Sequence, residues 1–264
     1  MRWIFLLLTY SLHAAYVGNP AGPGIMNNGF FTSTNPFFKC TTGYYGDYIS
    51  DMRFVPAKSS TNRATDHTFK QFGLHSQMAT ASLILLERIE FFGAAGGSKE
   101  HTHFSQTPSM TELSTELLDF HSTYTFSWCA GTRVILLQWW QTYFSMDFTY
   151  FQVPSSHESY FKFLNQLHLP LETEKQTFSI DEWQVSAGLS TRIYFLTPYG
   201  GVTYMKAKLN IEGGDEVPPL YYENQERIGY FYGLTLSLTG KFHVNFERRV
   251  RDEFAYTIST IAVF

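Results

Sequence analysis

The sequence contains few charged residues and no excess of basic ones. Of its 264 residues 16% are charged, with 19 Lys and Arg against 23 Asp and Glu. Globular domains carry about 25% charged residues on average, so a disordered or highly solvated chain is disfavoured. The net charge of -4 provides no basic surface to neutralise a phosphate backbone. We therefore expect no nucleic-acid partner.

Cysteines and long apolar runs are also scarce. The two cysteines, Cys40 and Cys129, are too few for a disulfide-dense scaffold or a four-cysteine zinc site. After residue 15, no apolar run approaches the roughly 20 residues that a membrane-spanning helix needs. A helical membrane protein is therefore excluded, and we expect no cofactor and no metal.

The first 15 residues have the pattern of a secretory signal peptide. Arg2 precedes a short apolar segment, and Ala14 and Ala15 stand where a peptidase would cut. Residues 16–43, rich in Pro and Gly, should form an irregular leader. We assign residues 1–15 to the signal peptide, 16–43 to the leader and 44–264 to the folded domain.

Aromatic residues are abundant, with 25 Phe, 17 Tyr and 5 Trp. Beyond residue 44 they alternate with small or polar residues, for example over residues 183–194, as in strands with one apolar face. A soluble sandwich also alternates, but these segments reach about 10 residues, whereas soluble strands average about 5 to 6. The sequence predicts an all-β fold, a transmembrane antiparallel β-barrel of about 12 strands within a range of about 10 to 16.

Connections between the predicted strands fall into two classes. Long polar stretches lie at 56–66, 96–114, 153–181 and 212–225, and the other connections are short. Long loops at one rim and short turns at the other are typical of outer-membrane barrels. The twelfth strand is expected in the leader or in residues 153–181. Eleven segments are recognisable, at 44–55, 68–86, 88–98, 116–136, 138–152, 158–165, 182–195, 197–210, 226–239, 241–251 and 253–264. Together with the signal peptide, this pattern predicts the outer membrane of a Gram-negative bacterium.

Charged residues on the polar face of the strands should line a pore. A charge on the lipid face costs about 2 to 4 kcal/mol at the bilayer midplane, so alternation assigns these residues inward. An alternative is that they pair with one another and close a small barrel, since wide channels belong to barrels of about 16 to 18 strands. The predicted pore-lining residues are Asp47, Asp51, Arg53, Arg88, Glu90, Arg133, Asp147, Arg192, Lys206, Lys208, Lys241, His243 and Glu247.

Two clusters resemble catalytic or metal sites without meeting their geometry. Asp119 and His121 share a strand face, whereas Ser122 points to the other side, so an acid, base and nucleophile cannot be linked. Residues 100–103 hold two histidines, but a closed zinc site needs about four ligands, so a solvated loop is the preferred interpretation. We expect no enzyme activity.

The two cysteines allow several interpretations in an oxidising compartment. Cys129 lies on the predicted lumen face, so a disulfide with Cys40 is possible if the leader enters the lumen. Pairing of Cys40 with another chain and two free thiols are the alternatives.

Several short motifs occur in an order that resembles the chlamydial major outer membrane protein family of porins. These are residues 17–21, 43–47, 126–128 with Gly131 and Arg133, 182–184, 197–199 with 201–202, and Phe264. The resemblance spans residues 17 to 264. It implies passive diffusion of small hydrophilic solutes and ions, often through a homotrimer, in a disulfide-stiffened envelope. The chain departs from the family's type member in being shorter and poor in cysteine.

The last residue, Phe264, has two predicted roles. An aromatic at the end of the closing strand should anchor it at the membrane interface. By the resemblance, Phe264 is also part of the signal read by the barrel-assembly machinery. The function hypotheses are therefore a diffusion porin or, alternatively, a non-conducting structural or adhesive barrel whose loops meet other proteins.

Overall fold

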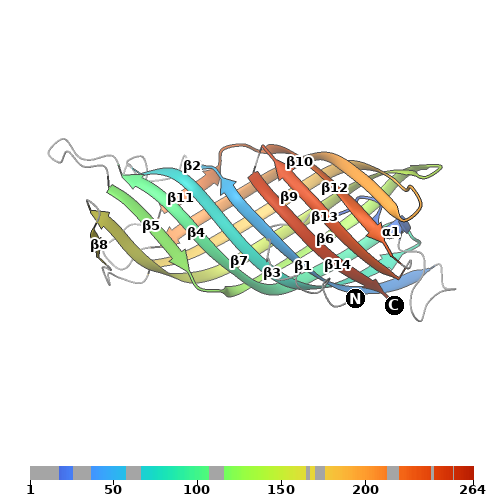
Figure 1. Cartoon of the computed structure of the whole chain (residues 1–264), viewed down its shortest axis with the longest axis horizontal. Helices are drawn as coiled ribbons and strands as arrows, with labels where there is room; N and C mark the ends of the chain where they lie inside the picture. The colour runs from blue at the N-terminus through green and yellow to red at the C-terminus, as the bar shows by residue number, and fades with distance from the viewer. Residues whose placement is uncertain are drawn as a thin grey trace, which may run out of the picture.

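The computed structural model describes residues 18–25, 37–57, 67–106, 116–164, 167–169, 176–212, 220–238, 241–251 and 253–264. One short helix, α1 (Gly22–Ile25), accompanies a single barrel-shaped sheet (Figure 1). No helix in these ranges is long and apolar enough to cross a membrane. The strands are β1 (Phe38–Met52), β2 (Phe54–Pro56), β3 (His67–Leu85), β4 (Ile89–Gln106), β5 (Glu116–Ser122), β6 (Thr125–Trp139), β7 (Thr142–Leu164), β8 (Leu167–Leu169), β9 (Gln176–Thr191), β10 (Leu196–Glu212), β11 (Leu220–Asn224), β12 (Ile228–Ser237), β13 (Phe242–Val250) and β14 (Glu253–Val263).

Ten strands close the barrel at the end where its tight turns lie. Their order is β1, β3, β4, β6, β7, β9, β10, β12, β13 and β14, and β14 pairs back onto β1. Every pairing is antiparallel, as expected for consecutive hairpins. The predicted all-β barrel is therefore confirmed, and its ten strands lie at the lower end of the predicted range.

The wall is narrower at the opposite end. There β5 takes the place of β6, β11 takes the place of β12, and β2 continues β1 and pairs with β11. We call the pairing of β2 with β11 the seam. The β13–β14 hairpin ends below it. Eight strand positions, β1 with β2, β3, β4, β5, β7, β9, β10 and β11, thus surround the interior at this level.

Some strand boundaries differ from the sequence prediction. Residues 138–152 and 158–165, expected as two strands, are joined in β7, because an irregularity between Val153 and Ser156 shifts its register against β9 without ending the strand. The expected strand 116–136 is divided at residues 123–124 into β5 and β6. Residues 96–106, expected in a loop, continue β4, which pairs with β3 along its full length.

The outer face of the ten-stranded part is apolar and bounded by aromatic rings. Trp139, Trp140 and Tyr194 are exposed at the turn end, and Tyr204, Tyr230 and Tyr256 form an upper aromatic row. Exposed aliphatic and aromatic side chains, among them Leu189, Val202, Phe148 and Phe246, lie between the two rows. Two aromatic girdles around an apolar band are the surface that a barrel presents to lipid.

Above the upper aromatic row the two faces exchange their polarity. On β10, Met205 and Leu209 point inward and are fully buried, whereas Lys206 and Lys208 lie on the outer face. An eight-stranded barrel is just wide enough for side chains to fill it. We call this apolar filling the upper core; it comprises Ile49, Met52, Phe54, Phe72, Leu74, Phe151, Val153, Phe178, Ile180, Met205, Ala207, Leu209, Ile211 and Tyr222. Burial raises the pKa of Tyr222 to about 12, so its phenol stays neutral there.

Candidate functional site in the barrel interior

The structure divides the thirteen predicted pore residues into three groups. One group is buried inside the wall, as predicted: Asp47, Glu90, Arg133, Asp147, His243 and Glu247. A second group, Arg88, Arg192 and Lys241, lies at the turn end of the barrel. The remaining four residues, Asp51, Arg53, Lys206 and Lys208, lie on the outer face.

The predicted inward positions of these four residues are wrong for two physical reasons. A β-bulge between Ile49 and Asp51 shifts the register of β1, so Met52 points inward and the charged neighbours point outward. Such a bulge reverses which face each later residue occupies. On β10 the alternation continues, but above the membrane the interior is apolar and the exterior meets water, so Lys206 and Lys208 are solvated outside.

A fully buried arginine that is not among the predicted pore-lining residues organises the centre of the interior. Arg249 donates from Nη2 to Asp47 Oδ2 at 2.6 Å and from Nη1 to Glu247 Oε1 at 3.3 Å. Its Nε also donates to Glu253, and Nη1 contacts the hydroxyl of Thr257. We call these five residues the Arg249 network. Arg249 has the same strand parity as His243 and Glu247, and this signal could have identified it.

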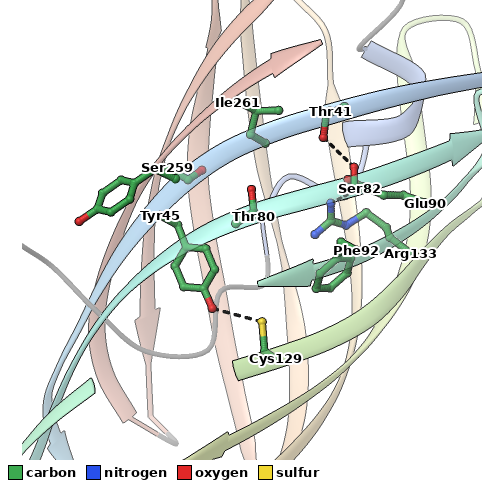
Figure 2. A pocket seen from close by; sticks show the side chains of 11 residues that line it. Thr41, Tyr45, Thr80, Ser82, Glu90, Phe92, Cys129, Arg133, Ser259 and Ile261 are labelled. Carbon is green, nitrogen blue, oxygen red and sulfur yellow. Dashed lines mark hydrogen bonds and ion pairs between the residues drawn. The ribbon is translucent and has the colours of Figure 1, made fainter. Parts of the chain in front are cut away.

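A second ion pair lies nearer the turn end. Arg133 donates to Glu90 at 2.8 Å, and its guanidinium stands 5.5 Å from the centre of the Phe92 ring. Figure 2 shows Arg133 and Glu90 near Tyr45 and Cys129. The hydroxyl oxygen of Tyr45 lies 3.3 Å from Cys129 Sγ. The space between these groups measures about 30 Å³, enough for one or two water molecules.

Residues 18–25 of the leader lie inside the barrel at the turn end, near the C-terminus (Figure 1). We call this buried segment the plug. The Gly18 amide donates to Glu247 Oε2 at 3.0 Å, and Asn19 Nδ2 donates to the Thr235 hydroxyl at 2.6 Å. Ser145 donates to the Pro20 carbonyl at 2.6 Å. Because Glu247 also contacts Arg249, the plug is linked to the Arg249 network.

A glycine of the wall leaves space for the plug, and apolar contacts hold the plug in place. Gly188 on β9 faces the interior, and a Cβ atom there would lie 2.7 Å from Pro20 Cγ. Within the plug, Ala21 and Ile25 pack in one cluster with Ile84, Ile135, Tyr143 and Val263 of the wall. The predicted irregular leader thus contains one helical turn held by side chains of several strands.

The described interior is filled at three successive levels. The plug occupies the turn end, the two ion-pair groups occupy the middle, and the upper core occupies the loop end. Across the described residues these three fillings close the lumen, and Arg133 and Arg249 form ion pairs with carboxylates inside it. This is the alternative to an open pore in which the charged residues close a small barrel.

The two cysteines lie on opposite faces of the wall. Cys129 is buried inside, whereas Cys40 is exposed, and both thiols are free. Side chains on opposite faces of a sheet cannot reach the separation that a disulfide requires. The internal disulfide, one of the three possibilities considered, is therefore wrong, and pairing of Cys40 with another chain stays a prediction.

The clusters that resembled catalytic or metal sites occupy strand positions. Ser122 is buried, and its hydroxyl accepts from the Glu100 amide at 2.8 Å. Residues 100–103 belong to β4 and not to the predicted solvated loop. The side chains of His103, Asp119 and His121 lie outside the described residues, and among the described ones no group of three potential ligands is arranged to hold a metal.

Comparisons with known proteins agree with this fold. No family model matches the chain. The major outer membrane porin of Chlamydia psittaci is 25% identical, over 76% of this chain and 72% of that protein. The same-named protein of Chlamydia muridarum is 23% identical, over 76% and 71%. The chain is thus similar to the chlamydial major outer membrane porins. The resemblance seen in the motifs is thereby confirmed.

A solved structure supports the architecture independently. The outer membrane protease OmpT of Escherichia coli aligns with a TM-score of 0.50 over 87% of this chain and 96% of that one, at 10% identity. So low an identity shows the fold alone. Together with the porin relatives, it locates the chain in the outer membrane. The tight turns then face the periplasm and the long connections face outward, as in other outer-membrane barrels.

Proposed function

We propose that the chain is an outer-membrane porin that passes small hydrophilic solutes and ions by passive diffusion after a closed interior has opened. The plug is the observation that carries this proposal. It is a terminal segment whose polar contacts to the wall include three hydrogen bonds, from Gly18, Asn19 and Ser145. A segment held in this way can leave without breaking any strand pairing.

The inner face of the wall around the plug carries polar side chains, as the wall of a water-filled channel does. Ser145, Thr235, Asn245, Glu247 and Ser259 point inward in the ten-stranded part. At the external end, the seam joins β2 to β11 through three residue pairs. In this proposal, departure of the plug opens the periplasmic side, and parting of the seam opens the external side. The chain acts as a channel and not as an enzyme.

A second candidate, a non-conducting structural or adhesive barrel, is favoured by the upper core. Its side chains are as buried as those of a soluble protein's core, and each large apolar group contributes about 1.5 to 3 kcal/mol when buried. Opening this end would expose several such groups. In this second case the external loops would meet other proteins while the lumen stays closed.

Liposome swelling with a small sugar separates the two candidates. We expect unmodified barrels to swell slowly, and barrels lacking residues 18–25 or carrying Gly188→Leu to swell several-fold faster, because only the seam then still has to part. The leucine would occupy the space of Pro20 and expel the plug. Ala187→Leu is the matched control, because the neighbouring residue faces lipid. Correctly folded plug variants that remain as slow as the control would support the structural barrel.

Further partners belong to the same proposal. Phe264 is fixed to the first strand by its amide, which donates to the Cys40 carbonyl at 2.8 Å. We propose that the barrel-assembly machinery recognises this end, that membrane lipid surrounds the apolar band, and that the barrel forms a homotrimer. Deletion of Phe264 should lower the amount of inserted barrel in an outer-membrane fraction, and an unchanged amount would exclude the recognition role.

A further inference from the structure

Three arginines from separate segments lie outside the wall near the tip of the β13–β14 hairpin, where backbone contacts bring these segments together. Arg53 follows β1, Arg227 precedes β12 and Arg251 follows β13. The Gln225 amide donates to the Arg53 carbonyl at 2.8 Å, which brings the first two segments together. Glu253, two residues after Arg251, pairs with Met52, next to Arg53. We call these residues the arginine cluster.

Each guanidinium of the cluster is oriented by one neighbour. Arg227 lies 3.0 Å from Glu223, whose other oxygen is 3.4 Å from Lys206 Nζ. Arg251 donates to the Tyr230 hydroxyl at 3.3 Å and stands over that ring. Arg53 lies 3.8 Å from Asp51 and is 68% exposed. A guanidinium has five N–H donors, so these contacts leave donors available on the exposed edges.

The surroundings of the cluster are basic although the whole chain is acidic. The described outer residues around the hairpin tip include the cations Arg53, Lys206, Lys208, Arg227, Arg248 and Arg251 and the acids Asp51, Asp181, Glu223 and Glu226. Six cations thus face four acids among the described outer residues, on a chain whose net charge is -4. Concentrated positive charge of this kind attracts anions.

The level of the arginine cluster along the barrel axis indicates which kind of anion it can bind. Tyr230 and Tyr256 belong to the upper aromatic row, and the guanidiniums of Arg251 and Arg248 stand 5.9 and 5.1 Å from the centres of these rings. Aromatic girdles lie at the level of lipid headgroups. Directly below, Tyr232 and Phe246 present apolar surface along which acyl chains can lie.

We propose that the arginine cluster binds the phosphate group of a phosphate-bearing lipid in the external leaflet. Arginine suits this ligand because its planar fork donates two parallel hydrogen bonds to phosphate oxygens. Three forks from three segments hold the headgroup over the hairpin tip, and the acyl chains lie against the apolar band. The lipid thereby ties together the segments on both sides of the seam.

Thermal unfolding of the full mature barrel in detergent tests this proposal. The probes are bisphosphorylated lipid A, the same lipid without phosphates, and inorganic phosphate. We expect only the phosphorylated lipid to raise the unfolding midpoint at micromolar concentration. The triple variant R53Q/R227Q/R251Q should need at least about tenfold more of this lipid for the same shift, given the strength of charge-assisted hydrogen bonds. Arg88→Gln, at a periplasmic turn, is the matched control and should respond like the unmodified chain.

Several outcomes would overturn the proposal. These are an equal response of the triple variant and the unmodified chain, no shift with phosphorylated lipid, or an equal shift with the dephosphorylated lipid. A shift with inorganic phosphate as large as that with the lipid would indicate a soluble anion as the ligand, and would also overturn it. Heat-dependent gel migration shows that each variant is folded. The result is independent of conductance.

Discussion

Arg249 is the side chain whose loss the fold should tolerate least. It is fully buried among three carboxylates, those of Asp47, Glu247 and Glu253. Removing one partner of a buried ion pair costs about 3 to 5 kcal/mol, because a buried charge is left uncompensated. Arg249→Met should therefore lower the urea midpoint of unfolding in detergent strongly. Arg248→Met, one residue away on the outer face, should change it little; equal effects would contradict the network.

The two cysteines allow a simple test of which face each residue occupies. A maleimide added to the folded barrel should label Cys40 and leave Cys129 unmodified, because only the former is exposed. After unfolding, both thiols should react without any reductant. Mass spectrometry counts the labels. An unreduced chain that takes up no label after unfolding would reveal a disulfide within the chain and contradict the assignment.

At the scale of the strand, β10 tests the reversal of polarity above the membrane. Leu209 is buried in the upper core, and Lys208 lies outside. Leu209→Ala should destabilise the barrel by about 2 to 5 kcal/mol, the usual range for a buried leucine. Lys208→Ala should change stability by less than about 0.5 kcal/mol, as most surface substitutions do. Urea unfolding in detergent measures both, and a larger effect of the lysine variant would show that the faces are assigned incorrectly.

The strands also show what could be predicted from the sequence. Alternation of bulky and polar residues identified the barrel and placed Asp47, Arg133 and Glu247 inside, because a charge in lipid is costly at any such position. The positions of Asp51 and Arg53 could not be predicted, since a single bulged residue reverses the face. Lys206 was wrongly predicted to face the lumen, because alternation shows that two faces differ in polarity but not whether the polar one faces the interior or the exterior.

At the scale of the whole molecule, two sections with opposite polarity share one continuous wall. The ten-stranded section meets lipid and has a polar interior, whereas the eight-stranded section meets water and has an apolar one. A period of two is common to both, so the sequence predicted one long lumen. The plug was also beyond prediction, because its contacts join residues more than a hundred positions apart, such as Pro20 and Ser145.

The central claim is that the interior of the unmodified barrel is closed, and single-channel recording tests it most directly. The purified mature chain, folded and inserted into a planar bilayer in salt solution, should give no steady conductance steps at low voltage. Heat-dependent gel migration of the same sample establishes that the barrel is intact. Stable, uniform open steps from the unmodified chain would contradict the closed interior described by the plug, the Arg249 network and the upper core.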